Sequence, residues 1–324
     1  MKRTSSRRSF LLAAAGAAGI ACSPATESPA PSTESSAELS APLIESHLHL
    51  FAADREKFPL HPNAPYDPAA APLEAYIAFA GEAEIDGAVI VHPEPYQDDH
   101  SYLEYCFENE PSPGFFKGTC LFDTLDPKTP ERMRSLVEKY PGRMIALRVH
   151  EMHEPGTPYE ASGPIRNRDM SDPRMRESCQ AAHDLGLAIQ MHFLPYYAPM
   201  IGSLIGQVAG VRVILDHLGR AGMGTDEQFQ QVLELGKQPN VIMKYSGVGY
   251  SSNQPFPHDD ARSVVERALG AFGADRLIWG GLGQSMEAFA QQQELFANMF
   301  VSASEEDKAK IRGQNAARLF QFNV

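Results

Sequence analysis

Short runs of apolar, often β-branched residues recur eight times along the chain, and a stretch with helical periodicity follows each of them. The runs are Leu43–Phe51, Gly87–His92, Phe115–Phe122, Met144–His150, Ala188–Phe193, Arg212–Leu218, Val241–Gly247 and Arg276–Gly281. A regular alternation of strand and helix favours a parallel sheet that is covered by helices. Eight such units within 324 residues predict an α/β protein with a (β/α)8 TIM barrel.

Helix start signals agree with this alternation. A cap residue or a first-turn proline precedes three of the expected helices: Thr129-Pro130 before Met133–Tyr140, Asp172-Pro173 before Arg174–Leu185, and Ser304 before Glu305–Phe320. The other fold with this alternation is an open, doubly wound sheet, which usually carries a phosphate-binding G-x-G-x-x-G after its first strand. The only comparable run, Gly280-Gly281-Leu282-Gly283, lacks that spacing and comes last, so the barrel is favoured.

The first 40 residues have the pattern of an export signal and a tether. Residues 1–22 combine four basic residues with an apolar stretch, and Ser6–Leu11 resembles a twin-arginine signal. Gly19-Ile20-Ala21-Cys22 resembles a lipoprotein cleavage box, so a lipid on Cys22 and cleavage near Ala21 without a lipid are both open. Residues 23–40 are rich in Ser, Pro, Ala, Thr and Glu, which is typical of a flexible linker. We therefore expect export to the periplasm or cell envelope, and a barrel domain over residues 41–324.

Composition limits the partners. Lys and Arg total 28 against 41 Asp and Glu, for a net charge of −13, which argues against nucleic acid. No apolar run reaches the roughly 20 residues that cross a bilayer, so the only membrane contact that we expect is a lipid on Cys22. Cys106, Cys120 and Cys179 have neither zinc-like nor redox spacing. A small-molecule substrate is the expected partner, and nothing in the sequence predicts the oligomeric state.

Polar residues stand at the ends of the expected strands, where a barrel builds its active site. The first run contains His47-Leu48-His49, and strand alternation places both imidazoles on one side, close enough to share a metal ion. The later runs supply His92, then Arg148 and His150, His192, Asp216-His217 and Lys244. Adjacent strand residues face opposite sides, so we expect that Asp216 and His217 do not both face the barrel interior.

These motifs together resemble a known family. The His-x-His pair, Gln190-Met191-His192, Leu215–Arg220, Asn240–Gly247 and Gly273–Gly280 are similar to the amidohydrolase-related TIM-barrel hydrolases, from about Leu43 to Phe320. The segment His92–Leu103 resembles the lactonase-like branch, which contains sugar-acid lactonases and 2-pyrone-4,6-dicarboxylate lactonase.

The resemblance implies hydrolysis of a lactone or related cyclic ester or amide. It places His47, His49 and His192 around a divalent metal, commonly zinc, with His217 as the base. Arg148 would hold a substrate carboxylate, and His92, Tyr96, His150 and Lys244 are the further candidates for substrate binding. The segments 59–72, 151–172 and 248–260 are expected to roof the pocket.

Two positions depart from the family pattern. Glu45 stands where the first motif usually begins with Asp, and Leu282 stands where strand eight usually supplies an Asp that binds metal and accepts a proton. Leucine can do neither, so the substitute carboxylates to consider are Glu45, Glu151 and Glu287. Two alternatives to the metal-dependent hydrolase stay open: a metal-independent lactonase that uses Arg148, Lys244 and the histidines, and a non-catalytic relative that binds a small ligand.

Overall fold

The computed structural model describes residues 41–159 and 162–324. The predicted export signal, the linker and Cys22 lie outside the described residues and stay predictions. Eight strands form one sheet in the order β1 to β8, and each consecutive pair is parallel. They are β1 Ile44–Leu48, β2 Gly87–Ile90, β3 Phe116–Cys120, β4 Met144–Glu151, β5 Ala188–Phe193, β6 Val213–Leu215, β7 Val241–Tyr245 and β8 Leu277–Trp279.

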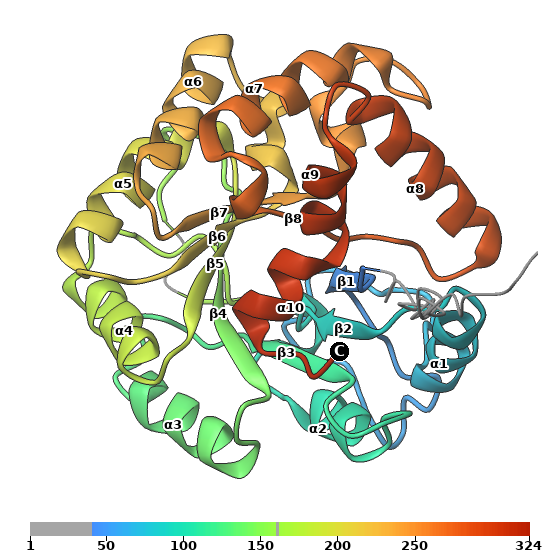
Figure 1. The fold of residues 1–324 in the computed structure, drawn as a ribbon. Coiled ribbons are helices and arrows are strands. Elements are labelled where there is room, and N and C mark those ends of the chain that lie inside the picture. The colour runs from blue at the N-terminus through green and yellow to red at the C-terminus, as the bar shows by residue number, and fades with distance from the viewer. Residues whose placement is uncertain (1–40, 160–161) are drawn as a thin grey trace, which may run out of the picture. The chain divides into compact units, whose positions relative to one another are not determined.

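Helices surround the strands, which confirms the predicted (β/α)8 barrel (Figure 1). They are α1 Leu73–Glu82, α2 Ser101–Glu108, α3 Thr129–Lys139, α4 Pro173–Asp184, α5 Ala198–Gln207, α6 Asp226–Glu234, α7 Arg262–Phe272, α8 Met286–Met299, α9 Glu305–Ala309 and α10 Asn315–Phe320. A π-helical turn, Lys310–Gln314, joins α9 to α10 and interrupts the single helix expected there.

Two of the three expected caps are confirmed. The Asp172 carboxylate accepts a hydrogen bond from Arg174 N at 2.9 Å, and the Ser304 hydroxyl accepts one from Asp307 N at 3.1 Å. Thr129 was expected to cap α3 but is its first residue, and its hydroxyl instead donates to the Asp123 carbonyl at 2.5 Å.

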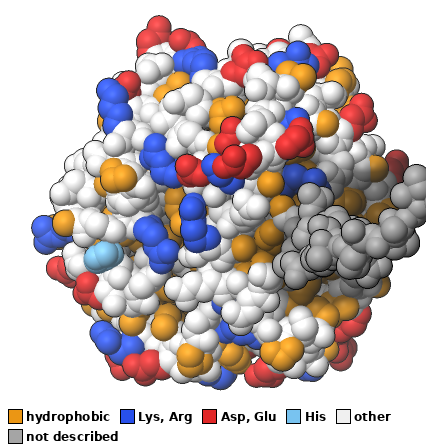
Figure 2. Space-filling view, viewed as in Figure 1, with side chains coloured by type: hydrophobic (Ala, Val, Ile, Leu, Met, Phe, Trp, Pro, Cys, Tyr) orange, Lys and Arg blue, Asp and Glu red, His pale blue; other side chains and the backbone are white. Residues whose placement is uncertain are grey.

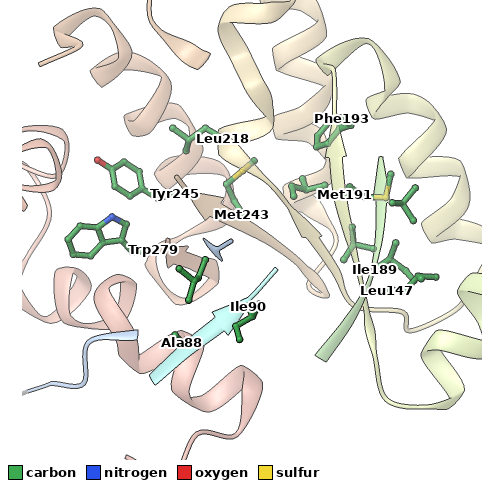
Figure 3. Close-up of a cluster of buried hydrophobic side chains, with 14 of the residues drawn as sticks. Ala88, Ile90, Leu147, Ile189, Met191, Phe193, Leu218, Met243, Tyr245 and Trp279 are labelled. Atoms are coloured by element: carbon green, nitrogen blue, oxygen red, sulfur yellow. The ribbon is translucent and has the colours of Figure 1, made fainter. Parts of the chain in front are cut away.

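Strand side chains divide between two cores with a period of two. One residue set faces the barrel interior as an apolar layer: Ile44, Val89, Ala146, Ala188, Ile214, Ile242 and Ile278. Residues of alternate positions, such as Leu147, Ile189 and Met191, join the cluster between strands and helices (Figure 3). Two positions beyond the apolar layer, the interior becomes polar, with Arg148, Gln190, Asp216 and Lys244 all buried.

The two ends of the barrel are therefore different. At the amino ends of the strands, α10 lies across the opening and Phe320 and Phe322 join the apolar interior layer (Figure 1). The face seen in Figure 2 carries Lys, Arg, Asp and Glu side chains in mixed positions. Within the described ranges, no helix is both long and apolar enough to span a membrane. The polar interior layer leaves the carboxyl ends of the strands as the place for a site.

Side chains of β1 bridge the seam between β1 and β8. The Ser46 hydroxyl donates to the Trp279 carbonyl at 2.5 Å. The Glu45 carboxylate accepts backbone hydrogen bonds from Gly281 at 2.7 Å, from Leu282 at 2.5 Å and from His47 at 2.6 Å. Burial raises the pKa of Glu45, and these three backbone bonds and Lys244 oppose that rise. Glu45 thus holds the turn that follows β8 against the first strand.

The π-helical turn lets the end of the chain approach β1 closely. A Cβ atom at Gly313 would overlap the backbone carbonyl of Pro42, which cannot move as a flexible side chain could. We expect Gly313→Ala to lower the free energy of unfolding by about 3 kcal/mol, measured by urea denaturation. Gly270→Ala in α7 is the matched control, since its Cβ would meet no atom within 4 Å and should stabilise the helix slightly. Equal stabilities of the two variants would contradict this packing.

Candidate active site

An irregularity in β1 turns His47, and His49 directly after the strand, into the site. Ile44 faces the apolar interior, so strict alternation would turn His47 away from it. The pairing with β2 shifts register between Glu45 and Leu48, and beyond this shift His47 and His49 both line the cavity. Their ring centroids are 4.9 Å apart. The prediction that both imidazoles face the same side is confirmed.

The end of β6 corrects one expectation. Asp216 and His217 were expected to face opposite sides, but donor atoms of both lie with one of His47 in a group within 4.8 Å of one another. The reason is that β6 ends at Leu215 and His217 has a left-handed backbone with φ 55°. Alternation applies only within a strand, and the turn swings the imidazole back beside Asp216. The His217 Nδ1 pairs with the Ser246 hydroxyl at 2.9 Å, which fixes the ring.

Asp216 and Lys244 form a fully buried ion pair beneath the imidazoles. Lys244 Nζ lies 3.2 Å from Asp216 Oδ1 and 3.4 Å from His47 Nδ1. Gln190 Nε2 donates to both oxygens of Asp216, at 3.1 and 3.0 Å. Burial alone would raise the pKa of Asp216, but Lys244 and His47 hold it well below its ordinary value. The carboxylate is therefore ionised at neutral pH and partly neutralised by a cation of the protein itself.

A cavity of about 510 Å³ opens above this polar layer. His47, His49, Arg148, His192 and His217 line it, which brings together five of the residues singled out from the sequence. Tyr66 from the segment 59–72, and Tyr250, Phe256 and His258 from the segment 248–260, also line it, as expected for roofing loops. The segment 151–172 contributes indirectly, since Arg166 lies 3.9 Å from Glu94, a further lining residue.

His192 lies between two guanidinium groups. Arg220, which sequence reasoning did not single out, donates to His192 Nε2 and stacks over the Tyr250 ring at 3.8 Å. Arg148 Nη2 lies 3.5 Å from His192 Nδ1. Burial, with His150, Arg148 and Arg220 nearby, holds the pKa of His192 well below its ordinary value, so the imidazole is neutral. The sequence did contain one indication that Arg220 belongs to the site, because Arg220 ends the segment Leu215–Arg220 that carries the family resemblance after β6.

Four predicted substrate-binding residues lie outside the cavity lining. Val89 and Val91 face the interior, so His92 points to the helix side, where it stacks on His100 at 4.3 Å. Tyr96 is buried, and its hydroxyl accepts a hydrogen bond from Ala52 N at 2.8 Å. His150 and Lys244 are buried one step behind the lining, against Glu94 and Asp216 respectively. The positions of Tyr96 and His92 favour a role in packing. The positions of His150 and Lys244 favour a role in supporting the residues that line the cavity.

A comparison with known families covers nearly the whole described chain. The model of the family described as amidohydrolase matches residues 44–322. The chain belongs to the amidohydrolase family. This membership identifies it as a hydrolase and confirms the resemblance stated from its motifs.

Individual relatives are more distant. This amidohydrolase is 28% identical over 244 residues to 4-sulfomuconolactone hydrolase of Rhizobium radiobacter, covering 73% of each chain. A Pseudomonas putida structure described as a 2-pyrone-4,6-dicarboxylic acid hydrolase matches with a TM-score of 0.71 and 20% identity, over 88% of this chain and 100% of that one. A zinc-bound amidohydrolase of Burkholderia multivorans matches with a TM-score of 0.65 and 16% identity, over 87% and 100%. At these identities the solved structures establish the fold.

The donors of this amidohydrolase fit a divalent metal ion. His47, His217 and Asp216 offer two nitrogens and one oxygen within 4.8 Å of one another, a donor set that suits zinc. Burial lowers the pKa of His217 and of the adjacent His49 to about 3, so both imidazoles are in the neutral form that binds metals. The predicted set of His47, His49 and His192 overlaps this group only at His47. Ligation by His192 stays a prediction, and would require Arg220 to release Nε2.

None of the three carboxylates proposed to replace the strand-eight Asp lines the cavity. Glu45 is held by backbone amides, Glu151 by His153 at 2.6 Å, and Glu287 lies in the first turn of α8. Leu282 itself is fully buried in the core between strands and helices. The carboxylates that do reach the site are Asp216, beneath the imidazoles, and Glu94, in the lining. Asp216 comes two positions after Ile214, and strand alternation places both side chains on the interior face. The sequence alone therefore indicated that Asp216 faces the interior.

Proposed function

We propose that this amidohydrolase hydrolyses a small lactone that carries an acidic group, a carboxylate or a sulfonate. The observation that carries the proposal is the pair of guanidinium groups, Arg148 and Arg220, which flank His192 in the cavity lining. Guanidinium forks bind carboxylate and sulfonate oxygens through paired hydrogen bonds. Support also comes from two similar proteins that are named as hydrolases of 4-sulfomuconolactone and of 2-pyrone-4,6-dicarboxylic acid, both acidic lactones.

We assign the metal site to His47, His217 and Asp216, with zinc as the proposed ion. A bound divalent cation would polarise the lactone carbonyl and make water a better nucleophile near neutral pH. Arg148 and Arg220 would orient the acidic group of the substrate, and Tyr250, held under Arg220, would cover it from water. If His217 serves as a ligand, another group must accept the proton, whereas the resemblance gave His217 the role of base.

A second candidate is the same hydrolysis without a metal ion. Lys244 Nζ already lies among the proposed donors, 3.2 Å from Asp216 and 3.4 Å from His47. A fixed ammonium group in a buried position can stabilise negative charge that develops on a carbonyl oxygen. This candidate keeps the same substrate class and differs only in the source of positive charge.

Metal content distinguishes the two candidates. We expect the purified protein to hold about one zinc ion per chain, and His47→Ala to lose at least nine-tenths of it together with about 100-fold of kcat/KM on 2-pyrone-4,6-dicarboxylate or 4-sulfomuconolactone. Inductively coupled plasma mass spectrometry measures the metal, and His183→Ala in α4, outside the cavity lining, is the control.

The other outcomes are equally clear. Undiminished activity of the wild type after chelation, with no metal bound, would favour the Lys244 candidate. A wild type that holds metal yet opens neither acidic nor neutral lactones would overturn the proposed function.

A further inference from the structure

One carboxylate lines the cavity among the described residues, and it is Glu94. It follows β2 and begins the short 3-10 turn Glu94–Tyr96, so it stands at the carboxyl end of the barrel. Only 8% of the residue is exposed. Asp216, the other carboxylate near the site, is already bonded to Lys244 and Gln190 and lies outside the lining. Any acid or base chemistry by a carboxyl group in this cavity therefore falls to Glu94.

The two oxygens of Glu94 have different surroundings. Oε2 lies 3.4 Å from His150 Nδ1, and His150 Nδ1 lies 3.3 Å from His192 Nδ1. Oε1 accepts no hydrogen bond from the described residues, although it is buried. A buried oxygen without a partner is costly, so it is a position where a bound molecule or water completes the hydrogen bonding. His150 lies beside one oxygen of the carboxylate, and the other has only the Arg166 guanidinium at 3.9 Å, beyond hydrogen-bonding distance, so a substrate or water can bond to it.

Charged and titratable groups meet Glu94 from three segments. Arg148 and His150 approach from β4, Arg166 from the segment 151–172 and Tyr66 from the segment 59–72. Burial raises the pKa of the Glu94 carboxyl above its ordinary value, while Arg148 and Arg166 oppose part of that rise. Burial, and next the charge of Arg148, hold the pKa of His150 well below its ordinary value. The His150 imidazole is therefore neutral, and the positive charges near Glu94 are those of Arg148 and Arg166. A carboxyl group with a raised pKa is more basic as an anion than an exposed one.

We propose that Glu94 is the catalytic residue that accepts and returns the proton during lactone hydrolysis, an inference that rests on the proposed function. In the first step, a water oxygen bonds to the lactone carbonyl carbon while Glu94 takes one proton from that water. In the second step, the bond between the carbonyl carbon and the ring oxygen breaks, and Glu94 returns the proton to that oxygen. One water is consumed, the ring opens to a hydroxy acid or its keto tautomer, and Glu94 is again a carboxylate. His150 acts as a positioning residue.

The test compares Glu94→Gln with the wild type on 2-pyrone-4,6-dicarboxylate and on a neutral lactone, dihydrocoumarin. Glutamine keeps the shape of the side chain but cannot take a proton. We expect kcat to fall by about 100- to 1,000-fold with KM changed less than about threefold, and the fall in kcat towards acidic pH to disappear from the profile. Glu154→Gln, exposed in the segment 151–172, is the matched control. Added formate should restore part of the activity of Glu94→Ala, because a free carboxylate can occupy the vacated space.

The results distinguish failure of the role of Glu94 from failure of the proposed function. An active wild type with a Glu94→Gln variant that keeps its kcat, or that loses only affinity, would overturn the role of Glu94 and leave the proposed function standing. A wild type that opens no lactone would overturn the proposed function and this role with it. Far-ultraviolet circular dichroism and the urea midpoint of Glu94→Gln confirm that the comparison is made on folded protein.

Discussion

Replacing Lys244 with Met should lower the free energy of unfolding by about 3–5 kcal/mol, one of the two largest effects that we expect from a single substitution. The substitution leaves the Asp216 carboxylate fully buried, with Gln190 Nε2 at 3.1 and 3.0 Å and His47 Nδ1 at 3.6 Å as its remaining partners. Without a counter-charge, nothing offsets the free-energy cost of removing this ionised carboxylate from water, and the folded state is destabilised. Urea denaturation of chelator-treated protein measures the change, since a bound metal ion would otherwise supply the missing charge.

The matched control is the double variant Lys244→Met with Asp216→Asn. It removes both charges and keeps the shape of the carboxyl group, so most of the lost stability should return. Lys139→Met, which removes a half-exposed partner of Glu104 on the surface, should cost less than about 1 kcal/mol. A loss below about 1 kcal/mol for Lys244→Met would contradict the view that Lys244 is the counter-ion of Asp216.

Replacing Arg220 with Ala should lower kcat/KM for 2-pyrone-4,6-dicarboxylate by about 100-fold, and for the neutral dihydrocoumarin by less than about tenfold. A charged hydrogen bond in a desolvated pocket contributes a few kcal/mol, and about 2.7 kcal/mol corresponds to that factor. The loss should appear mainly in KM if Arg220 holds the acidic group equally in the ground state and the transition state. Steady-state kinetics on the two lactones measures it.

Arg220→Lys provides a stricter comparison. Lysine keeps the charge but not the planar fork that stacks over Tyr250 at 3.8 Å, so we expect it to recover little of the loss. Arg174→Ala, at an exposed position of α4, should leave kcat/KM for both substrates unchanged. Equal losses of kcat/KM on the acidic and neutral lactones would mean that Arg220 acts by positioning His192 and not by binding the acidic group of the substrate.

The barrel and most of its interior follow from alternation alone. Ile214 and Ile242 face the apolar layer, so Asp216 and Lys244 two positions later had to face the polar one. Seven of the eight expected runs contain a strand of the structure and the fourth falls one residue short of the end of β4, since β-branched runs and helix caps are local signals. The same rule, applied from Val89 and Val91, also shows why His92 faces away from the cavity.

Other parts of the site could not be predicted because they depend on breaks in that alternation. The register shift in β1 re-aims His47, and the left-handed φ at His217 places it beside Asp216. Neither break has a glycine or proline at the position to signal it. Glu94 lies in a turn, where a carboxylate is usually solvated, and only the folded structure buries it, beside β4 and the segment that follows β4.

The seam between β1 and β8 joins the first strand of the barrel to the turn that follows the last one. The hydrogen bonds from Gly281 and Leu282 to Glu45 join residues 236 and 237 positions apart, and the same carboxylate holds His47 N. Contacts over such separations cannot form until the intervening chain has been synthesised, and they cost more loop-closure entropy than local contacts. During synthesis, Glu45 therefore lacks two of its three backbone partners until residues 281 and 282 have left the ribosome. The histidine pair that appears earliest in the chain is among the last parts of the site to reach its working geometry.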